Sequence, residues 1–277
     1  MSFFQGKVVI VTGSSNGIGR SAARMFAEKG AKVTIHGRNA ETLKVTKEEC
    51  LAAGAKAEDI AEVLGDMASE ETRHKLVDET VKKFGQIDVL VNNAGFYQVP
   101  TDGTSGLDTS IDIYDRLMAV NLRAVLHLSQ LAVTYLEKTK GAIVNVSSIV
   151  AQPFCAPNFY YSLSKAGLDE LTVHLGGNLI AKGIRVNSVN PGVVDTDFLR
   201  KVMPEEAAKK MYEEKWGKNP DAVPLGRCGV PDDIAKIILF LADKTQSEYI
   251  VGQRIVADGG SILKNVLLST NSSVQAK

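Results

Sequence analysis

Seven short, nearly continuous apolar runs rich in β-branched residues alternate with longer amphipathic stretches along the whole 277-residue chain. Runs of this kind are typical of strands that are buried on both faces of a parallel sheet. We predict strands at residues 8–12, 32–36, 60–64, 89–92, 142–147, 185–190 and 254–257. The stretches between them predict helices at residues 17–29, 40–53, 69–84, 113–138, 157–182 and 231–241.

This alternation predicts an α/β fold, a doubly wound, Rossmann-type parallel sheet of seven strands with helices on both faces. A chain of this length with 44% hydrophobic residues can bury such a sheet in one domain. We expect that domain at residues 1–264, followed by a polar C-terminal tail at 265–277. Two long segments without a clear period, 96–112 and 192–230, should lie beyond the carboxyl edge of the sheet, where such folds bind ligands.

Charge and cysteine content exclude several classes of function. The 32 basic residues balance the 32 acidic ones, which leaves no net field to attract a nucleic acid or an anionic membrane surface. The three cysteines are widely spaced and fit reduced thiols better than a disulfide framework or a metal site. No secretion signal is visible, and no apolar run reaches the roughly 18 residues of a membrane span. We therefore expect a cytoplasmic protein without a metal, a nucleic-acid partner or a membrane partner.

A glycine-rich loop, TGSSNGIG at residues 12–19, joins the first predicted strand to the first helix. Gly13, Gly17 and Gly19 allow a tight turn and let a diphosphate approach the amides at the helix N-terminus. No lysine follows Gly17, so a loop that grips a triphosphate is excluded. A plain tight turn is the alternative, but the first strand-to-helix turn of an α/β chain is where dinucleotides bind.

The second predicted strand ends in His36-Gly37-Arg38-Asn39. A carboxylate in this region would grip a ribose 2′-hydroxyl and favour NAD, whereas Arg38 offers a forked, charge-assisted grip on a 2′-phosphate. The sequence therefore predicts NADP(H) as the preferred cofactor, with NAD(H) possible. The alternative is that Arg38 only decorates a surface turn. We expect His36 to line the adenosine region passively.

Tyr161 and Lys165 are one helical turn apart, and Ser148 follows an apolar strand upstream of them. A phenol titrates near pH 10, so it exchanges protons at neutral pH only if the phenolate is stabilised, and an ammonium at i+4 is placed to do so. Ser148 could hold a substrate oxygen. A solvated helix face is the alternative for this pair taken alone.

Together these residues resemble the short-chain dehydrogenase/reductase family in its single-domain branch. The likeness covers nearly the whole chain, and within the branch the chain is most similar to ketoreductases of the tropinone-reductase-like and ketoacyl-reductase-like sort. The motifs that carry it are TGSSNGIG, NNAG at 92–95, Asn121, Ser148, YSLSK at 161–165, Pro191-Gly192 and Asp258-Gly259-Gly260.

The resemblance implies an NADP-dependent oxidoreductase that transfers a hydride between nicotinamide and a small carbonyl compound or secondary alcohol. Tyr161 would be the general acid in ketone reduction, and Ser148 would position the substrate oxygen. Lys165 would lower the pKa of Tyr161 and hold the nicotinamide ribose. Asn121 would anchor a water that links Lys165 to solvent.

The resemblance also implies the residues that contact the cofactor. Asp66 would hold the adenine amino group, and Thr196 would hold the nicotinamide amide. The full set is Gly13, Ser15, Asn16, Gly17, Ile18, Gly19, Arg38, Asp66, Met67, Asn93, Ala94, Gly95, Tyr161, Lys165, Pro191, Gly192, Val194 and Thr196.

Several of these residues have rivals or plainer roles. Asn121 could bond only to local backbone, and Asp66 could cap the helix that begins near Ser69. Ser147 points to the opposite face of its strand from Ser148, and the family interval selects Ser148. Tyr160 lacks a lysine four residues later.

Aromatic and methionine side chains in the irregular segments could bind the substrate and favour an apolar or alicyclic ketone, although ordinary packing is the alternative. Candidates for the cleft wall are Phe96, Tyr97, Phe154, Cys155 and Phe159, and candidates for a lid are Phe198, Met203, Met211, Tyr212 and Trp216. A non-catalytic NADP-binding scaffold or redox sensor, and an epimerase or dehydratase on the same fold, remain alternatives. The resemblance also implies a homodimer or homotetramer.

Overall fold

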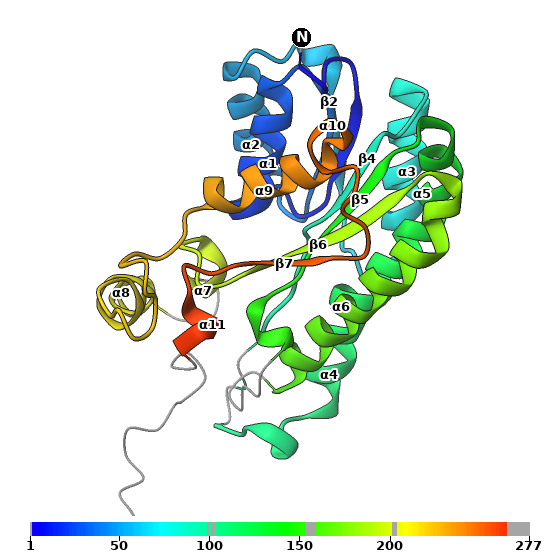
Figure 1. Ribbon diagram of the computed structural model, residues 1–277. Helices are drawn as coiled ribbons and strands as arrows, with labels where there is room; N and C mark the ends of the chain where they lie inside the picture. The colour runs from blue at the N-terminus through cyan, green and yellow to red at the C-terminus, as the bar shows by residue number, and fades with distance from the viewer. Residues whose placement is uncertain (1, 99, 101–102, 153–158, 201–203, 265–277) are drawn as a thin grey trace, which may run out of the picture.

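The parallel sheet lies between two layers of helices (Figure 1). The computed structural model describes residues 2–98, 100, 103–152, 159–200 and 204–264, so the predicted tail at 265–277 lies outside the described residues. In the described part of the chain, seven strands pair in parallel in the order β3-β2-β1-β4-β5-β6-β7. This confirms the predicted doubly wound α/β fold. The strands are β1 Val8–Val11, β2 Lys32–Gly37, β3 Ile60–Leu64, β4 Val89–Asn92, β5 Ala142–Val146, β6 Arg185–Pro191 and β7 Arg254–Ala257.

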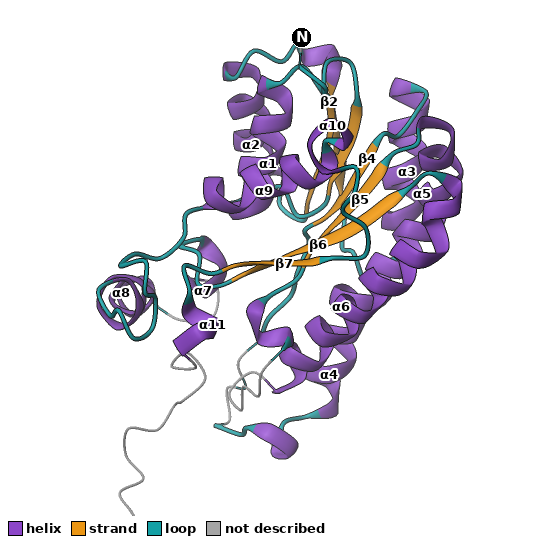
Figure 2. Ribbon diagram, viewed as in Figure 1, coloured by secondary structure: helices purple, strands orange, loops and turns teal. Residues whose placement is uncertain are grey.

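Helices cover both faces of the sheet (Figure 2). One layer consists of α1 Gly17–Glu28, α2 Ala40–Ala52 and α9 Pro231–Ala242, and the other of α3 Glu70–Phe84, α5 Ala124–Thr139 and α6 Phe159–Leu179. Successive strand side chains alternate between these layers. Val9 and Val11 pack with Phe26 of α1 and Ile238 of α9, whereas Ile10 packs in the opposite core with the residues of α3 and α5. All the β1 residues are buried, which explains why the run is apolar without alternation.

The predicted strands and four of the predicted helices begin and end within one residue of the observed bounds. The remaining two predicted helices differ in detail. The predicted helix at 113–138 consists of α4 Ile111–Met118, a π-helical turn η3 Ala119–Arg123, and α5. The helix predicted at 157–182 is α6 followed by the 3₁₀ turn η6 Ile180–Lys182.

The segment at 192–230, which was expected to be irregular, contains short helices. Its hydrophobic pattern is too short and mixed to predict them. These are α7 Asp197–Arg200, α8 Glu205–Lys210 and the π-helical turn η7 Met211–Gly217. The remaining short elements are η1 Ala57–Asp59, η2 Gly106–Asp108, η4 Ile149–Ala151, α10 Lys244–Ser247 and α11 Ser261–Lys264. Figure 1 shows α7, α8 and α11 beyond the carboxyl ends of β6 and β7.

Among the residues that the structure describes, one helix is long and apolar enough, by length and composition alone, to cross a membrane. It is the continuous helix Ile111–Thr139, whose most apolar window has a mean hydropathy of 1.3. The core helix of a globular protein meets the same criterion. Here 44% of the window is buried inside the fold, and Leu128, Ala132 and Leu136 belong to the core beneath α5. Packing against the sheet therefore accounts for its apolar character.

Arg185 fixes α9 and α10 to the edge of the sheet. Its side chain lies at the start of β6 and is 5% exposed. The guanidinium donates to the carbonyl oxygens of Leu241 (2.9 Å), Ala242 (3.2 Å) and Ser247 (3.1 Å). Leu241 and Ala242 end α9, where the last carbonyls have no partner within the helix and a cation is favourable.

We predict that Arg185→Ala lowers the free energy of unfolding by roughly 3 kcal/mol, because the carbonyl of Ala242 loses its donor and those of Leu241 and Ser247 each lose a charged one. Urea unfolding followed by circular dichroism measures the change. Lys182→Ala is the matched control: Lys182 pairs with Glu137 at 3.2 Å but is 44% exposed, so its loss should be below about 0.5 kcal/mol. Equal losses in the two variants would contradict the role given to Arg185.

Candidate active site

A cleft of about 940 Å³ runs along the carboxyl edge of the sheet. The loops that follow β1, β2, β3, β4, β5 and β6 all contribute to its walls. It spans the point between β1 and β4 at which the strand order reverses, which is where open α/β sheets bind ligands. All the predicted cofactor and catalytic residues line this cleft except Gly19 and Asn121.

At its glycine positions, the loop after β1 has no room for side chains. Gly13 (φ +63°) and Gly17 (φ +54°) adopt left-handed backbone conformations. A Cβ atom on Gly13 would lie 2.8 Å from the Cα of Ala94, and one on Gly17 would lie 3.1 Å from Cγ2 of Thr196. Gly19 was expected to contact the cofactor, but it is buried against Asn93 and the carbonyl of Gly13 and does not line the cleft. Its role is to let α1 approach the loop closely.

The residues present fit a dinucleotide. Asn16, the N-cap of α1, makes no side-chain capping bond, so the first-turn amides of this 12-residue helix face the cleft without a side-chain acceptor. Amides in that position, together with the helix dipole, bind anionic groups such as a diphosphate. Arg38 is exposed at the rim of the same cleft and could bind a further phosphate.

Ser148, Tyr161 and Lys165 converge on the cleft from β5 and α6. Tyr161 and Ser148 are joined by a hydrogen bond. The Nζ atom of Lys165 donates to the carbonyl of Val146 (2.9 Å) and lies 5.7 Å from the ring centroid of Tyr161. A hydroxyl pair beside a buried ammonium can exchange a proton with a bound oxygen atom.

The rival hydroxyls already have hydrogen-bond partners, although Ser147 also lines the cleft. The hydroxyl of Ser147 donates to the carbonyl of Lys165 (3.3 Å), inside the contact between β5 and α6. The hydroxyl of Tyr160 donates to the carbonyl of Thr109 (3.0 Å), and its ring packs edge-on against Tyr114. Because both hydroxyls are used in packing contacts, the geometry favours the neighbouring residues of each pair as the ones that face a ligand.

Burial dominates the electrostatics of the site. It raises the pKa of Tyr161, nearby Tyr97 raises it further, and the hydrogen bond with Ser148 only partly opposes them. We expected Lys165 to lower this pKa, and that contribution stays a prediction. The net direction is upward because taking a phenolate out of water is costly. Burial also lowers the pKa of Lys165 to about 8, although Asp169 opposes that shift.

Asn121 is fully buried in the π-helical turn η3 and does not reach the cleft. Its side chain accepts from the amide of Phe96 (2.8 Å) and donates to the carbonyl of Phe96 (3.0 Å) and to the hydroxyl of Ser164 (3.0 Å). It thus braces the loop after β4 against α6, the helix that carries Tyr161 and Lys165.

Asp66 lines the cleft after β3 but already has two partners. One carboxylate oxygen accepts from the amide of Ala68 (2.9 Å), and the other pairs with Arg116. Partial burial opposes ionisation, but these hydrogen bonds hold the pKa of Asp66 below its ordinary value. Arg116, whose guanidinium also lies 5.4 Å from the ring centroid of Phe96, is a cleft residue that sequence reasoning missed. Nothing in the local pattern of α4 marks it.

The two segments beyond the carboxyl edge meet over Tyr161. The ring of Tyr97 stacks on Phe198 (centroids 5.6 Å apart, 19° between planes) and meets Tyr161 edge-on (5.3 Å, 69°). The structure therefore brings Tyr97 and Phe198 together at the substrate end of the cleft.

The other aromatic and methionine candidates divide into three groups. The cleft is also lined by Phe96, Met211, Tyr212 and Trp216. Phe159 was expected in the cleft wall, but it does not line the cleft and packs against Tyr160 (5.4 Å). Phe154, Cys155 and Met203 lie outside the described residues.

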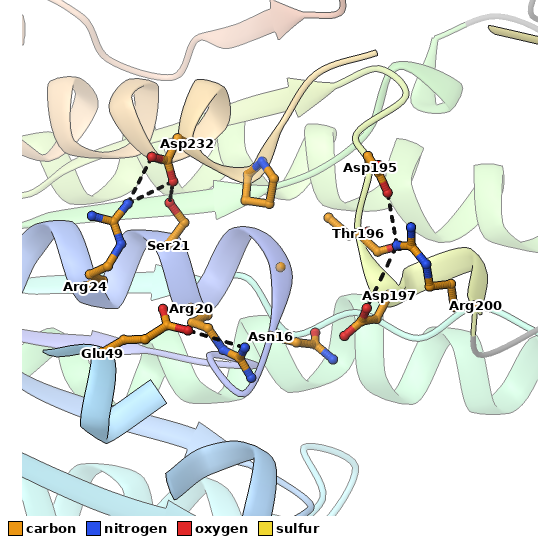
Figure 3. Close-up of a pocket in the computed structure, with 12 residues that line it drawn as sticks. Asn16, Arg20, Ser21, Arg24, Glu49, Asp195, Thr196, Asp197, Arg200 and Asp232 are labelled. Atoms are coloured by element: carbon orange, nitrogen blue, oxygen red, sulfur yellow. Dashed lines mark hydrogen bonds and ion pairs between the residues drawn. The ribbon is translucent and has the colours of Figure 1, made fainter. Parts of the chain in front are cut away.

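A second, polar pocket of about 430 Å³ lies beside the N-terminal half of α1 and shares Asn16, Gly17 and Thr196 with the cleft. Figure 3 shows that its charged side chains bind one another. Arg24 pairs with Asp232 (2.9 Å), Arg20 with Glu49 (3.5 Å) and Arg200 with Asp195 (3.0 Å). Two of these ion pairs therefore brace α1 against α2 and α9, and the third lies within the segment after β6.

Glu70, His74 and His127 place possible metal-ligand atoms within 4.8 Å of one another. Arg73, however, donates its Nε–H to Nδ1 of His127 at 2.8 Å. Burial lowers the pKa of His127, and the positive charges of Arg73 and Arg123 lower it further. Because the same charges repel a metal cation, this cluster disfavours a metal ion.

Comparison with known proteins identifies relatives along nearly the whole chain. Residues 13–261 match the family model described as enoyl-(acyl carrier protein) reductase. The chain is 34% identical to a 3-oxoacyl-[acyl-carrier-protein] reductase of Thermotoga maritima, over 94% of this chain and 99% of the relative.

Two solved structures from Caenorhabditis elegans are also similar. One is a short-chain dehydrogenase/reductase of unknown function with cofactor (46% identity, TM-score 0.92, covering 94% of this chain and 97% of the other). The other is an apo glucose dehydrogenase (42% identity, TM-score 0.79, covering 94% and 99%).

We predict that Lys165→Met is more stable than the parent chain at pH 7, because burying the ammonium opposes folding. The native amine, with a pKa of about 8, loses its proton before the unfolded amine, with a pKa of 10.5. Between these two pH values the unfolded chain binds more protons than the folded chain. As the pH increases, the free energy of unfolding of the parent should therefore rise relative to that of the variant, by roughly 3 kcal/mol in total. Urea titrations at pH 7, 8, 9 and 10 measure the difference, and a gap independent of pH would contradict the prediction.

Proposed function

Because the chain belongs to the short-chain dehydrogenase/reductase family, we propose that it is an NADP-dependent oxidoreductase that transfers a hydride between nicotinamide and a small carbonyl compound or secondary alcohol. The family binds NAD(P)(H) and acts on alcohol and carbonyl groups. The observation that carries the proposal is the convergence of Ser148, Tyr161 and Lys165 in a cleft whose other end fits a diphosphate.

In the direction of ketone reduction, Tyr161 donates its phenolic proton to the substrate oxygen. Its raised pKa keeps the phenol protonated at neutral pH, so the proton is present when the substrate binds. Ser148 holds the same oxygen through its hydroxyl. The ammonium of Lys165 offsets the negative charge that the departing proton leaves on Tyr161. A bound nicotinamide cofactor supplies the hydride.

In this proposal, different residues of the cleft bind different parts of the cofactor. The first turn of α1 binds the diphosphate, Arg38 binds the 2′-phosphate, and Thr196 holds the nicotinamide amide. NADP(H) is the preferred cofactor because Arg38, and not a carboxylate, stands at the rim after β2.

A cofactor-binding scaffold or redox sensor accounts for less of the site. Binding alone gains nothing from a buried phenol beside a buried ammonium, and the desolvation that lowers the pKa of Lys165 opposes folding.

The aromatic walls of Tyr97 and Phe198 favour an apolar or alicyclic carbonyl compound. The substrate panel should also include a sugar and an acyl thioester, because relatives named for glucose and 3-oxoacyl substrates are similar to this chain.

Self-association as a homodimer or homotetramer is part of the proposal. Exposed aliphatic side chains support it on the outer surfaces of α5 and α6, namely Leu126 (37% exposed), Leu163 (44%) and Val173 (36%).

A cytoplasmic location stays a prediction from the cysteine content. Cys50 and Cys228 carry free thiols in the described part of the chain.

We predict that Tyr161→Phe lowers kcat at least about 100-fold, because it removes the phenolic hydroxyl that would give the proton. The dissociation constant for NADPH should stay within about twofold, since the ring is retained. NADPH consumption with a carbonyl panel gives turnover, and nucleotide fluorescence gives binding. Tyr160→Phe is the matched control and should keep turnover, because its hydroxyl bonds to Thr109 outside the cleft. Full turnover by Tyr161→Phe would refute the assignment.

We predict that Arg38→Ala weakens NADPH binding about 10- to 100-fold and leaves NADH binding within about threefold, because a charge-assisted phosphate contact is lost. Titration of both nucleotides measures the effect. Lys44→Ala removes an exposed cation of α2 that does not line the cleft, and it should change neither affinity much. If Arg38→Ala weakened NADPH and NADH binding equally, the preference for NADP would not come from Arg38.

A further inference from the structure

We propose that His36 is a positioning residue of the cofactor site: its neutral imidazole fixes the glycine loop after β1 by bonding the backbone of Gly13 on one side and Gly65 on the other. The inference rests on the proposed function, because the loop that it positions is the one assigned to the cofactor diphosphate. It gives an active part to a side chain that the sequence analysis expected to be passive.

Both ring nitrogens of His36 are occupied by main-chain groups. Nδ1 accepts from the amide of Gly13 at 3.1 Å, and Nε2 lies 3.1 Å from the carbonyl oxygen of Gly65. A carbonyl oxygen can only accept, so the proton lies on Nε2 and Nδ1 keeps its lone pair for Gly13. These contacts define a single neutral tautomer in a side chain that is 2% exposed.

The main chain of His36 adds two further bonds to the same loop. Its carbonyl accepts from the amide of Ser14 (2.8 Å), and its own amide donates to the hydroxyl of Ser14 (2.8 Å). On the opposite side, the amide group of Asn93 donates to the carbonyl of Gly13 (3.0 Å). The donor and the acceptor of Gly13 are therefore both used by the protein, from β2 and from the loop after β4.

This arrangement has a consequence for anion binding. The amide of Gly13 is turned toward His36, so the donors left for a diphosphate are those of the first turn of α1. Without an acceptor at Nδ1, the Gly13 amide would lose its partner at a half-buried position, and the turn would relax to find another. The cradle that leads into α1 would then lose its fixed geometry, which is what makes an anion site bind tightly.

The ring is kept neutral by its surroundings. Burial lowers the pKa of His36 to about 4, and the charged groups facing it, Asp66 and Arg38, act in opposite directions. A protonated ring would direct an N–H at the N–H of Gly13 and break the contact. His36 is therefore neutral across the physiological range, which is the state that the two hydrogen bonds require.

Two conservative substitutions separate the two ring contacts. In His36→Asn, the side-chain oxygen takes the position of Nδ1 and can accept from Gly13, while the bond to Gly65 is lost. In His36→Gln, the terminal NH2 reaches toward Gly65, while Gly13 loses its acceptor. Each variant gives up one half-buried hydrogen bond, so their losses of stability should be similar. Thr80→Val is the control, because it removes a buried hydroxyl that bonds to Thr34 (2.8 Å) and to the carbonyl of Leu76 (2.6 Å) away from the cleft.

The test measures the dissociation constants of NADP+ and NADPH by titration, together with kcat at saturating cofactor and urea unfolding. We expect His36→Gln to raise the dissociation constants at least about tenfold and His36→Asn to raise them less than about threefold. Thr80→Val should leave them unchanged. All variants should keep kcat within about twofold, because the reacting groups are untouched.

The outcomes separate this inference from the proposed function. Equal dissociation constants in the parent chain and both His36 variants would overturn the positioning role while leaving the enzyme assignment intact. Equal weakening by Asn and Gln, in step with lost stability, would overturn it too, because it would show a purely structural residue. If the parent chain bound neither nucleotide, the proposed function itself would fail, and this inference with it.

Discussion

The reversal of strand order between β1 and β4 is the constraint on which the site depends. The crossovers run to opposite sides from this point, so the loops after the two strands part and leave a cleft between them. Local bonds hold its edges in place. The hydroxyl of Thr12 accepts from the amides of Asn93 and Ala94, both at 3.0 Å, which ties the end of β1 to the turn after β4. The position of the cleft is therefore a property of the sheet, and its chemistry comes from the side chains at its rim.

The site holds polar groups that the fold would be more stable without. Lys165 is buried with its ammonium on a backbone carbonyl, and burial raises the pKa of Asp169 one turn further along α6. One oxygen of Asp169 accepts from Asn190 (2.8 Å), but the other has no hydrogen-bond partner. A chain selected only for stability would fill these positions with apolar residues. Both lie on the same helix as Tyr161.

The cofactor end and the substrate end of the cleft are built differently. At the cofactor end, backbone groups are held by hydrogen bonds from β2 and β4, and the ion pairs of Figure 3 brace α1 from behind. At the substrate end, Tyr97 and Phe198 meet through stacked rings from segments far apart in the chain. Both ends of the cleft therefore depend on contacts between segments that are far apart in the chain.

The sequence alone determined the strands and the order of the elements. It also identified Ser148, Tyr161 and Lys165, the three residues that converge on the cleft. Strand and helix periods are local, and the i to i+4 spacing places the last two on one helix face whatever surrounds them. Only the tertiary structure decided what depends on distant neighbours. It paired Arg116 with Asp66 across 50 residues, turned Phe159 away from the cleft and used Asn121 to brace Phe96. It also set the direction of the Tyr161 pKa, because burial, the largest cause of the upward shift, is a property of the whole fold.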